Sequence, residues 1–430
     1  MQRFILACLA AAAAATAVVA QSPSPAPPGT CAPVGTPTCD PNGVPVPGGG
    51  GGDNSSVATV NAVTSTVRLG GGKAVVGAEG VALDPTTGLV YIGLNGNIIS
   101  GCQGDASLGG APVPIGAGAT QMSIVNPSTS REVAAVPTGQ APIWPTVDPS
   151  RGLVYMMGSG GQGTITVHNA ATGATVRTIV VGGRPHMGGL DYTTGLMLVG
   201  NTVRSSNVIT EQNHATIVNV ATSAIVREIE TSPAPHGVVV DQDRHVMFFS
   251  AVGDGAIVAV NASTGQVLYS DVPKKAYGTG FGGNNMLGRQ AATRLLFQVN
   301  TQMGATGLIV VDEVTLTPEK VITFGATGPV PWGMWVDEPN RLLFAALPNL
   351  NVIGVVDLDT KKHVASIPVG TCPYAVAIDP VRRIGVSSNQ GSPTENATAS
   401  VFGMCPVYIA TGRTVTGCSA LSELQIRRKR

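Results

Sequence analysis

Residues 57–404 are dominated by short runs in which apolar and polar positions alternate, separated by Gly, Pro, Asn or Asp. This period of two predicts β-strands, and no long stretch has the 3.6-residue apolar spacing of a helix. One unit recurs: a strand ending in Asp, a turn, a second strand with an aromatic or apolar residue seven positions after the Asp, and a hairpin. Its copies are VALDPTTGLVY, TVDPSRGLVY, GLDYTTGLML, VVDQDRHVMF, WVDEPNRLLF and AIDPVRRIGV.

The Asp that ends each first strand is the anchor of its repeat. The anchors are Asp84, Asp148, Asp191, Asp241, Asp337 and Asp379, and a degenerate copy, QAATRLLF, places Gln290 in the same register. A complete repeat contains four short strands. Seven such repeats predict an all-β fold, a seven-bladed β-propeller. The segment 57–69 resembles the hairpin half of a repeat, whereas the last anchor is followed by too few strands. The seventh blade is therefore expected to be closed by N- and C-terminal strands together.

These repeats resemble the YVTN-repeat family of β-propellers, within the quinoprotein amine dehydrogenase-like superfamily. The family's Val-Tyr-Val-Thr-Asn strand corresponds here to YIGL, YMMG, LVGN, FFSA, FQVN, FAAL and VSSN, and the resemblance covers about residues 57–404. It implies the propeller fold. Because the superfamily includes surface proteins, dehydrogenase subunits, haem d1 proteins and lactonase-like enzymes, it implies no particular activity.

The ends of the chain differ from the repeats. Residues 1–20 have one basic residue followed by an apolar run and small residues, which predicts a cleaved secretory signal peptide. Residues 21–56 are rich in Pro, Gly and Ser and are expected to form a linker. Residues 405–430 form a C-terminal tail with a Cys pair and a basic end. We therefore expect a protein that is secreted or held at the cell surface.

The amino-acid composition limits the kinds of partner that we expect for this protein. Charged residues make up 12% of the chain and the formal net charge is zero, which does not favour nucleic acid as a partner. Beyond the leader, no stretch is long and apolar enough to span a membrane. Three sequons, at Asn54, Asn261 and Asn396, are candidate glycosylation sites.

Removal of the leader leaves six cysteines, an even number that is typical of disulfides in an oxidising compartment. Cys102 follows the second strand of blade one, and Cys372 precedes the first strand of blade seven. These blades become neighbours when the ring closes, so Cys102–Cys372 is an expected bridge. Cys405 is expected at the opposite face, where Cys418 or one of the linker cysteines is a better partner than Cys372. Cys405–Cys418 and Cys31–Cys39 are therefore further expected bridges.

The candidate site is the mouth of the axial channel, where each first strand begins. The residue five before each anchor gives a mouth ring: Glu79, Ile143, His186, His236, Asn285, Trp332 and Tyr374. The longest loops, at 95–120, 201–214 and 389–398, are expected on the same face. These side chains form either a ligand site or a polar plug, and the sequence leaves both open.

Three functions compete. The first is a non-enzymatic binding or scaffold module whose ligand at the mouth is a protein, glycan or small molecule. The second is a metal-assisted lyase or lactonase, with Glu79, His186 and His236 holding a divalent metal ion. The third is a quinone- or haem-dependent dehydrogenase-like subunit, with Trp332 and Tyr374 stacking a flat cofactor. Motifs for a serine nucleophile elbow, haem attachment, a zinc helix or a phosphate loop are absent from the sequence, which favours the binding module.

Overall fold

The computed structural model describes residues 57–96, 120–201, 214–230, 235–251, 255–269, 286–300, 307–325, 330–392 and 394–418. All of them belong to one compact unit, Pro47–Arg430. Several predictions concern residues outside these ranges: the signal peptide, the linker, the basic end, Cys31, Cys39, Asn54, Cys102 and Asn285.

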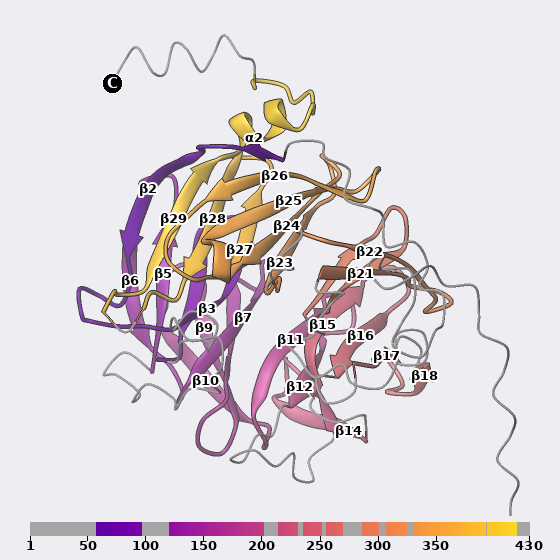
Figure 1. Ribbon diagram of the computed structural model, residues 1–430. Helices are drawn as coiled ribbons and strands as arrows, with labels where there is room; N and C mark the ends of the chain where they lie inside the picture. Colours follow the sequence, from indigo (N-terminus) through magenta and orange to yellow (C-terminus); the bar gives the residue numbers. More distant parts are fainter. Residues whose placement is uncertain are drawn as a thin grey trace, which may run out of the picture. The chain divides into compact units, whose positions relative to one another are not determined.

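The described residues form seven sheets, each a blade of the predicted propeller (Figure 1). Blade one contains β3 (Ala78–Leu83), β4 (Val90–Leu94), β5 (Gln121–Asn126) and β6 (Arg131–Pro137). Blade two contains β7 (Pro142–Asp148), β8 (Leu153–Gly158), β9 (Thr164–Asn169) and β10 (Thr175–Val180). Blade three contains β11 (Pro185–Asp191), β12 (Leu196–Asn201), β13 (His214–Asn219) and β14 (Ala224–Glu230).

The remaining blades repeat this order. Blade four contains β15 (Pro235–Asp241), β16 (Val246–Ala251), β17 (Ile257–Asn261) and β18 (Val267–Tyr269). Blade five contains β19 (Leu287–Gln290), β20 (Leu295–Asn300), β21 (Gly307–Asp312) and β22 (Pro318–Ile322). Blade six contains β23 (Met334–Asp337), β24 (Leu342–Leu347), the 3-10 helix η2 (Pro348–Leu350), β25 (Val352–Asp357) and β26 (Lys362–Pro368). Blade seven contains β27 (Pro373–Asp379), β28 (Ile384–Asn389) and β29 (Thr398–Gly403).

The ring closes through both ends of the described chain, as predicted. The N-terminal strand β2 (Val63–Arg68) pairs antiparallel with β29 and becomes the fourth strand of blade seven (Figure 1). Each blade's first strand contacts the first strand of the next blade, and β27 contacts β3. These first strands therefore form the inner ring.

The segment before β2 has a role that the sequence pattern did not predict. The sequence pattern assigns all of 57–69 to blade seven, but β1 (Ala58–Thr59) pairs in parallel with β26 and adds a fifth strand to blade six. Blade seven needs only β2 as its fourth strand. The segment before β2 therefore pairs with the exposed edge of the neighbouring blade. The backbone N–H of Val60 continues this pairing, donating to the carbonyl oxygen of Ser366 at 2.8 Å.

A glycine turn connects β2 to blade one. Gly70 and Gly71 have φ angles of 88° and 64°, a left-handed conformation that glycine adopts without steric cost. Their backbone N–H groups donate to the two carboxylate oxygens of Glu132, each at 2.8 Å. Successive N–H groups in such a turn form a concave anion site. Here the anion is the protein's own Glu132, which attaches the closing strand to the first blade.

The anchor aspartates stabilise turns. Asp191, for example, accepts hydrogen bonds at Oδ1 from the backbone N–H groups of Thr193 and Thr194, at 2.9 and 3.1 Å. Asp84 and Asp241 make the same kind of turn contact. Asp and Asn favour such turns because their short side chains reach the backbone two residues on. The repeat of Asp along the sequence is therefore explained by turn formation.

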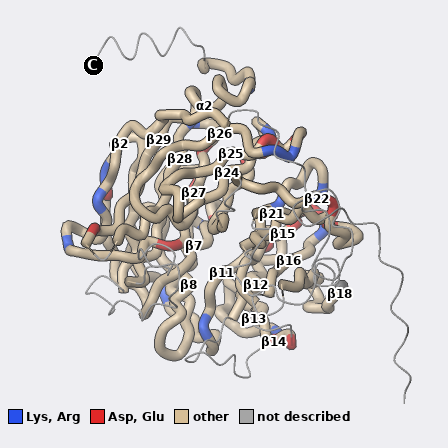
Figure 2. Tube along the Cα trace, in the orientation of Figure 1, with Lys and Arg blue, Asp and Glu red and all other residues tan. Residues whose placement is uncertain are grey.

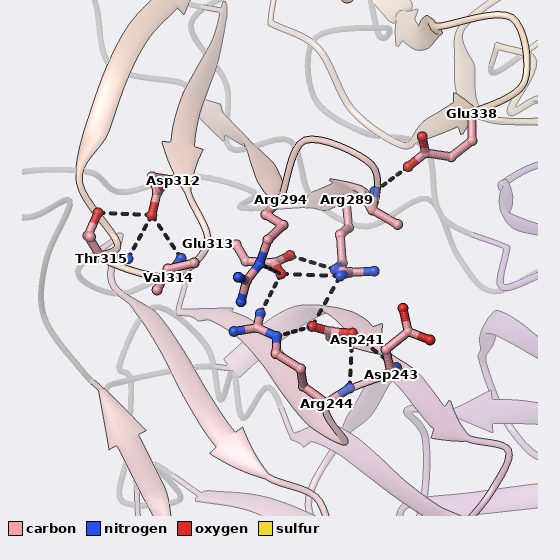
Figure 3. Close-up of polar contacts among 11 residues, drawn as sticks. Asp241, Asp243, Arg244, Arg289, Arg294, Asp312, Glu313, Val314, Thr315 and Glu338 are labelled. Atoms are coloured by element: carbon pink, nitrogen blue, oxygen red, sulfur yellow. Dashed lines mark hydrogen bonds and ion pairs between the residues drawn. The ribbon is translucent and has the colours of Figure 1, made fainter.

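Blade five, whose anchor position is Gln290, has a buried ion network at the corresponding end (Figure 3). Its centre is Glu313, which is 1% exposed and pairs with Arg289 at 2.6 Å. Arg244 and Arg294 also pair with Glu313, and Arg289 reaches Asp241 of blade four at 3.2 Å. A buried carboxylate requires such partners. Glu313 lies in the β21–β22 turn and not at the anchor position in the sequence of the repeat. The sequence pattern therefore did not identify it.

The C-terminal segment packs against blades six and seven. Helix α2 (Met404–Ala410) follows β29, and Met404, Val407 and Tyr408 join the apolar cluster formed by these blades. The predicted disulfide between Cys405 and Cys418 is present, with a Cα–Cα distance of 5.0 Å. The buried hydroxyl of Tyr408 donates to Oδ2 of Asp337, the anchor of blade six, at 2.7 Å.

Tyr408→Phe is expected to lower the free energy of unfolding by about 2 kcal/mol. The substitution removes a hydrogen bond to a buried carboxylate and leaves the ring in place. Chemical unfolding at pH 7 measures the effect. Tyr192→Phe is the matched control because the Tyr192 side chain is more exposed and its hydroxyl donates to a backbone carbonyl at 3.2 Å. Equal losses in both variants would contradict a special role for the contact with Asp337.

Charged residues are few and scattered along the described chain (Figure 2). Within the described residues, no helix has the length and apolar character needed to cross a membrane.

Candidate functional site: the channel mouth

The mouth ring occupies a common register in the inner strands. Its described members on strands are each the second residue of their strand: Glu79 of β3, Ile143 of β7, His186 of β11, His236 of β15 and Tyr374 of β27. Trp332 lies two residues before β23. Because each inner strand runs from the mouth to its anchor turn, counting back five residues from the anchor reaches the same level in successive blades.

A β-bulge lies at the ring position of all five strands. His186 has no opposite residue, because Pro185 pairs with Asn201 and Met187 with Gly200. Tyr374 is skipped in the same way between β27 and β28. At the other three strands, two residues face one: Glu79 and Gly80, Ile143 and Trp144, His236 and Gly237. Bulges redirect side chains and are over-represented next to functional sites.

Glu79 is a buried carboxyl group at the mouth. Glu79 is only 6% exposed, and Oε1 of its side chain accepts a hydrogen bond from Nδ2 of Asn95. Among the described residues, Oε2 has no hydrogen-bond partner. Burial raises the pKa of Glu79 to about 8, although the bond from Asn95 lowers the pKa in part. At neutral pH this group is therefore a protonated acid with an O–H available to donate.

Three aromatic rings lie at the mouth, one of them against Gly80, the residue after Glu79. The ring of Trp144 packs on Gly80, where a Cβ atom would be 2.5 Å from the indole. Tyr374 lies between two indoles, with ring centroids 6.5 Å from Trp144 and 4.9 Å from Trp332. Both tryptophans are half-buried, and Tyr374 is buried. Trp144 follows a ring residue and lies in its bulge, so a strict count from the anchor did not select it.

The two histidines stack on each other. The ring centroids of His186 and His236 are 3.5 Å apart, and the ring planes are inclined by 32°. Among the described residues, no group of three His, Cys, Asp or Glu side chains is placed to hold a metal ion. The predicted metal set of Glu79, His186 and His236 is therefore not assembled.

Cys372 lies at the start of the inner strand of blade seven. It is disulfide-bonded, and its predicted partner, Cys102, lies outside the described residues. Its φ angle of 58° is left-handed, and its backbone N–H donates to Oδ1 of Asn351 at 2.8 Å. Asn351 belongs to blade six, so this contact joins the last two blades at the mouth.

A separate groove of about 510 Å³ lies on blade two, away from the ring residues. Its lining is uncharged and includes Gln140, Gln162, Thr164 and Thr178. Within the described residues, no buried polar group in this groove lacks a hydrogen-bond partner. The mouth ring is therefore the stronger candidate site.

No protein-family profile matches the sequence, and no curated protein is similar to it at a significant level. Similarity appears among solved structures. Hydrazine synthase of Kuenenia stuttgartiensis aligns with a TM-score of 0.57 at 13% identity, over 76% of this chain and 96% of that one. A chain of a mitotic checkpoint complex aligns with a TM-score of 0.58 at 9% identity, over 84% and 96%. At these identities the likeness supports the seven-bladed β-propeller fold alone, and the YVTN family remains a resemblance.

Proposed function

We propose that this protein is a secreted or cell-surface β-propeller that binds a ligand at the channel mouth and acts as a binding or scaffold module. The observation that carries the proposal is the row of bulges at the ring positions of five inner strands. The Cys405–Cys418 disulfide is compatible with an exported protein.

The chemistry of the mouth supports an uncharged ligand. Glu79 offers a neutral O–H group at pH 7, and a buried polar atom without a partner favours a ligand or water that supplies one. Trp144, Trp332 and Tyr374 offer aromatic surface nearby. An ionic ligand would have to lose its hydration shell beside these groups. We therefore favour a glycan or another small molecule with hydroxyl or carbonyl groups.

The metal-assisted lyase or lactonase is less well supported because its three proposed ligands are not grouped. The two structural neighbours come from an enzyme and from a checkpoint complex, so they do not choose between chemistry and scaffolding. The quinone- or haem-dependent alternative rests only on the same aromatic residues, which the binding proposal already uses.

Intrinsic tryptophan fluorescence provides a direct test. Two of the three tryptophans in the chain, Trp144 and Trp332, lie at the mouth. We expect at least one member of a panel of neutral oligosaccharides and uncharged small carbonyl compounds to change the emission on titration. Trp332→Ala and His236→Ala are each expected to raise the Kd of that ligand about tenfold or more. A tenfold change corresponds to about 1.4 kcal/mol of binding free energy.

Thr86→Ala, in an anchor turn at the opposite end of blade one, is the matched control and should leave Kd unchanged. The binding is measured independently by calorimetry, because removal of Trp332 also removes a fluorophore. Equal losses for Thr86→Ala and His236→Ala would move the site away from the mouth. A panel without any binding member would contradict the assignment of an uncharged ligand.

A further inference from the structure

The outer hairpins share a turn in which one Asn or Asp side chain binds the backbone. At this residue, Oδ1 accepts hydrogen bonds from N–H groups two and three positions later. Asn261 binds Ser263 and Thr264 in this way, at 3.0 and 2.9 Å. The same pair of bonds is formed by Asn169, Asn219, Asp312 and Asp357. The hydrogen bonds of the turn therefore account for an Asn at position 261, whether or not this residue is modified.

The turn leaves the amide nitrogen of Asn261 unused. Oδ1 faces the backbone, and within the described structure no hydrogen bond involves Nδ2, which is not buried. Asn261 is half-exposed, and Ser263 and Thr264 are exposed. Residues 261–263 read Asn-Ala-Ser, an N-glycosylation acceptor. A glycan on Nδ2 would leave both turn hydrogen bonds in place.

We infer that Asn261 is the N-glycosylation site of the propeller and that its glycan projects from the end opposite the mouth. The Ala262 N–H donates to the carbonyl oxygen of His245 at 2.8 Å, so this turn lies beside the anchor turn of blade four. His236, by contrast, stands at the other end of β15. A bulky, solvated sugar at Asn261 leaves the mouth open.

The sequon at Asn396 lies in a different environment. The middle residues of the two sequons are alike, since Ala397 is fully buried, as Ala262 is, and its backbone N–H donates to the carbonyl oxygen of Val75 at 2.7 Å. The difference lies in the third residue. The hydroxyl of Thr398, the third residue of the sequon, accepts a hydrogen bond from Nδ2 of Asn389 at 3.0 Å. The required hydroxyl is therefore part of the blade-seven network. This contrast selects Asn261 among the described sequons.

The transfer uses a lipid-linked oligosaccharide pyrophosphate as donor. A bond forms between Nδ2 of Asn261 and the first carbon of the sugar, the bond between that carbon and the pyrophosphate oxygen breaks, and Nδ2 releases a proton. The reaction needs entry into an N-glycosylating export pathway, so the inference rests on the proposed secretion.

The repeated turns provide matched variants. Asp312 and Asp357 form the same turn with a carboxylate that accepts no glycan, so Asn261→Asp retains the turn and removes the acceptor. Ser263→Ala removes the sequon without changing Asn261. Asn126 ends the corresponding strand of blade one, but Pro127 blocks its Asn-Pro-Ser sequence. Pro127→Ala gives Asn126 the same Asn-Ala-Ser sequence as the natural site.

The test expresses the full chain behind a cleavable export signal of a yeast host, which ensures entry into the pathway. Peptide mapping before and after endoglycosidase treatment then locates each glycan. We expect Asn261 to be modified in more than half of the molecules, with loss in Asn261→Asp and Ser263→Ala and a gained glycan in Pro127→Ala. The Asn261→Asp protein should keep its unfolding midpoint and its ligand binding at the mouth. Failure of the glycosylation inference is therefore distinguishable from failure of the binding proposal.

An unmodified Asn261 in the secreted wild-type chain would overturn the inference, whichever other sequons are modified. Modification of Asn396 at higher occupancy than Asn261 would overturn the selection between them.

Discussion

A chain that begins at Leu69 is expected to lose about 5 kcal/mol or more of its free energy of unfolding relative to one that begins at Val57. The truncation removes β2, whose ladder with β29 includes five residue pairs. Each backbone hydrogen bond contributes about 1 kcal/mol, and the buried Val67 side chain about 2 kcal/mol more. The open edge of β29 would also become available for pairing with other chains.

Thermal unfolding and sedimentation measure both effects. The chain beginning at Val57 is the control, since it lacks only the segment before the described propeller. A third chain, beginning at Val63, removes β1 but retains β2, and its loss should be smaller because β1 forms only two ladder pairs. An unchanged midpoint in a monomeric chain that begins at Leu69 would show that β2 does not close the ring.

Glu79→Gln is expected to change the pH dependence of stability by up to about 5 kcal/mol. Burial raises the pKa of Glu79 from about 4.5 to about 8. Between these values the folded protein holds a proton that the unfolded chain has lost, so the free energy of unfolding falls as pH rises and levels off above pH 8. Each pKa unit corresponds to about 1.4 kcal/mol.

Glutamine keeps the acceptor for Asn95 and has no charge to bury. The two proteins should therefore be similarly stable near pH 4.5, and the Gln variant should be the more stable one at pH 9. Urea unfolding at several pH values gives the difference directly. Glu395→Gln, which removes an exposed carboxylate, should follow the wild-type curve. If Glu79→Gln and the wild type gave parallel curves, Glu79 would have the same pKa in the folded and unfolded protein. It would then be ionised at neutral pH, and the proposal of a neutral donor at the mouth would fail.

The level of the mouth ring followed from counting along the sequence, and the interactions within it did not. Counting from each anchor placed Glu79, His186, His236 and Tyr374 at one level, because the inner strands that carry these four residues have six or seven residues each. It missed Trp144, because a bulge places two consecutive residues at the mouth. The count also could not reveal that the histidines stack.

The sequence alone determined the local and periodic features of this protein. Period-two alternation, turn residues and the recurring Asp specify strands, hairpins and the number of blades, since these depend on interactions between near neighbours along the chain. The Cys405–Cys418 bridge could be predicted for the same reason, because its partners lie in one short segment. The closing role of β2 followed from the incomplete last repeat.

Only the tertiary structure decided contacts between blades and between distant segments. The pairing of β1 with β26, the arginines around Glu313 and the contact of Tyr408 with Asp337 all join residues whose separation follows no period. The protonation of Glu79 belongs to the same class, because burial by surrounding blades raises its pKa. Desolvation and ion pairing depend on what packs around a group, and alternation along one strand carries no information about that packing.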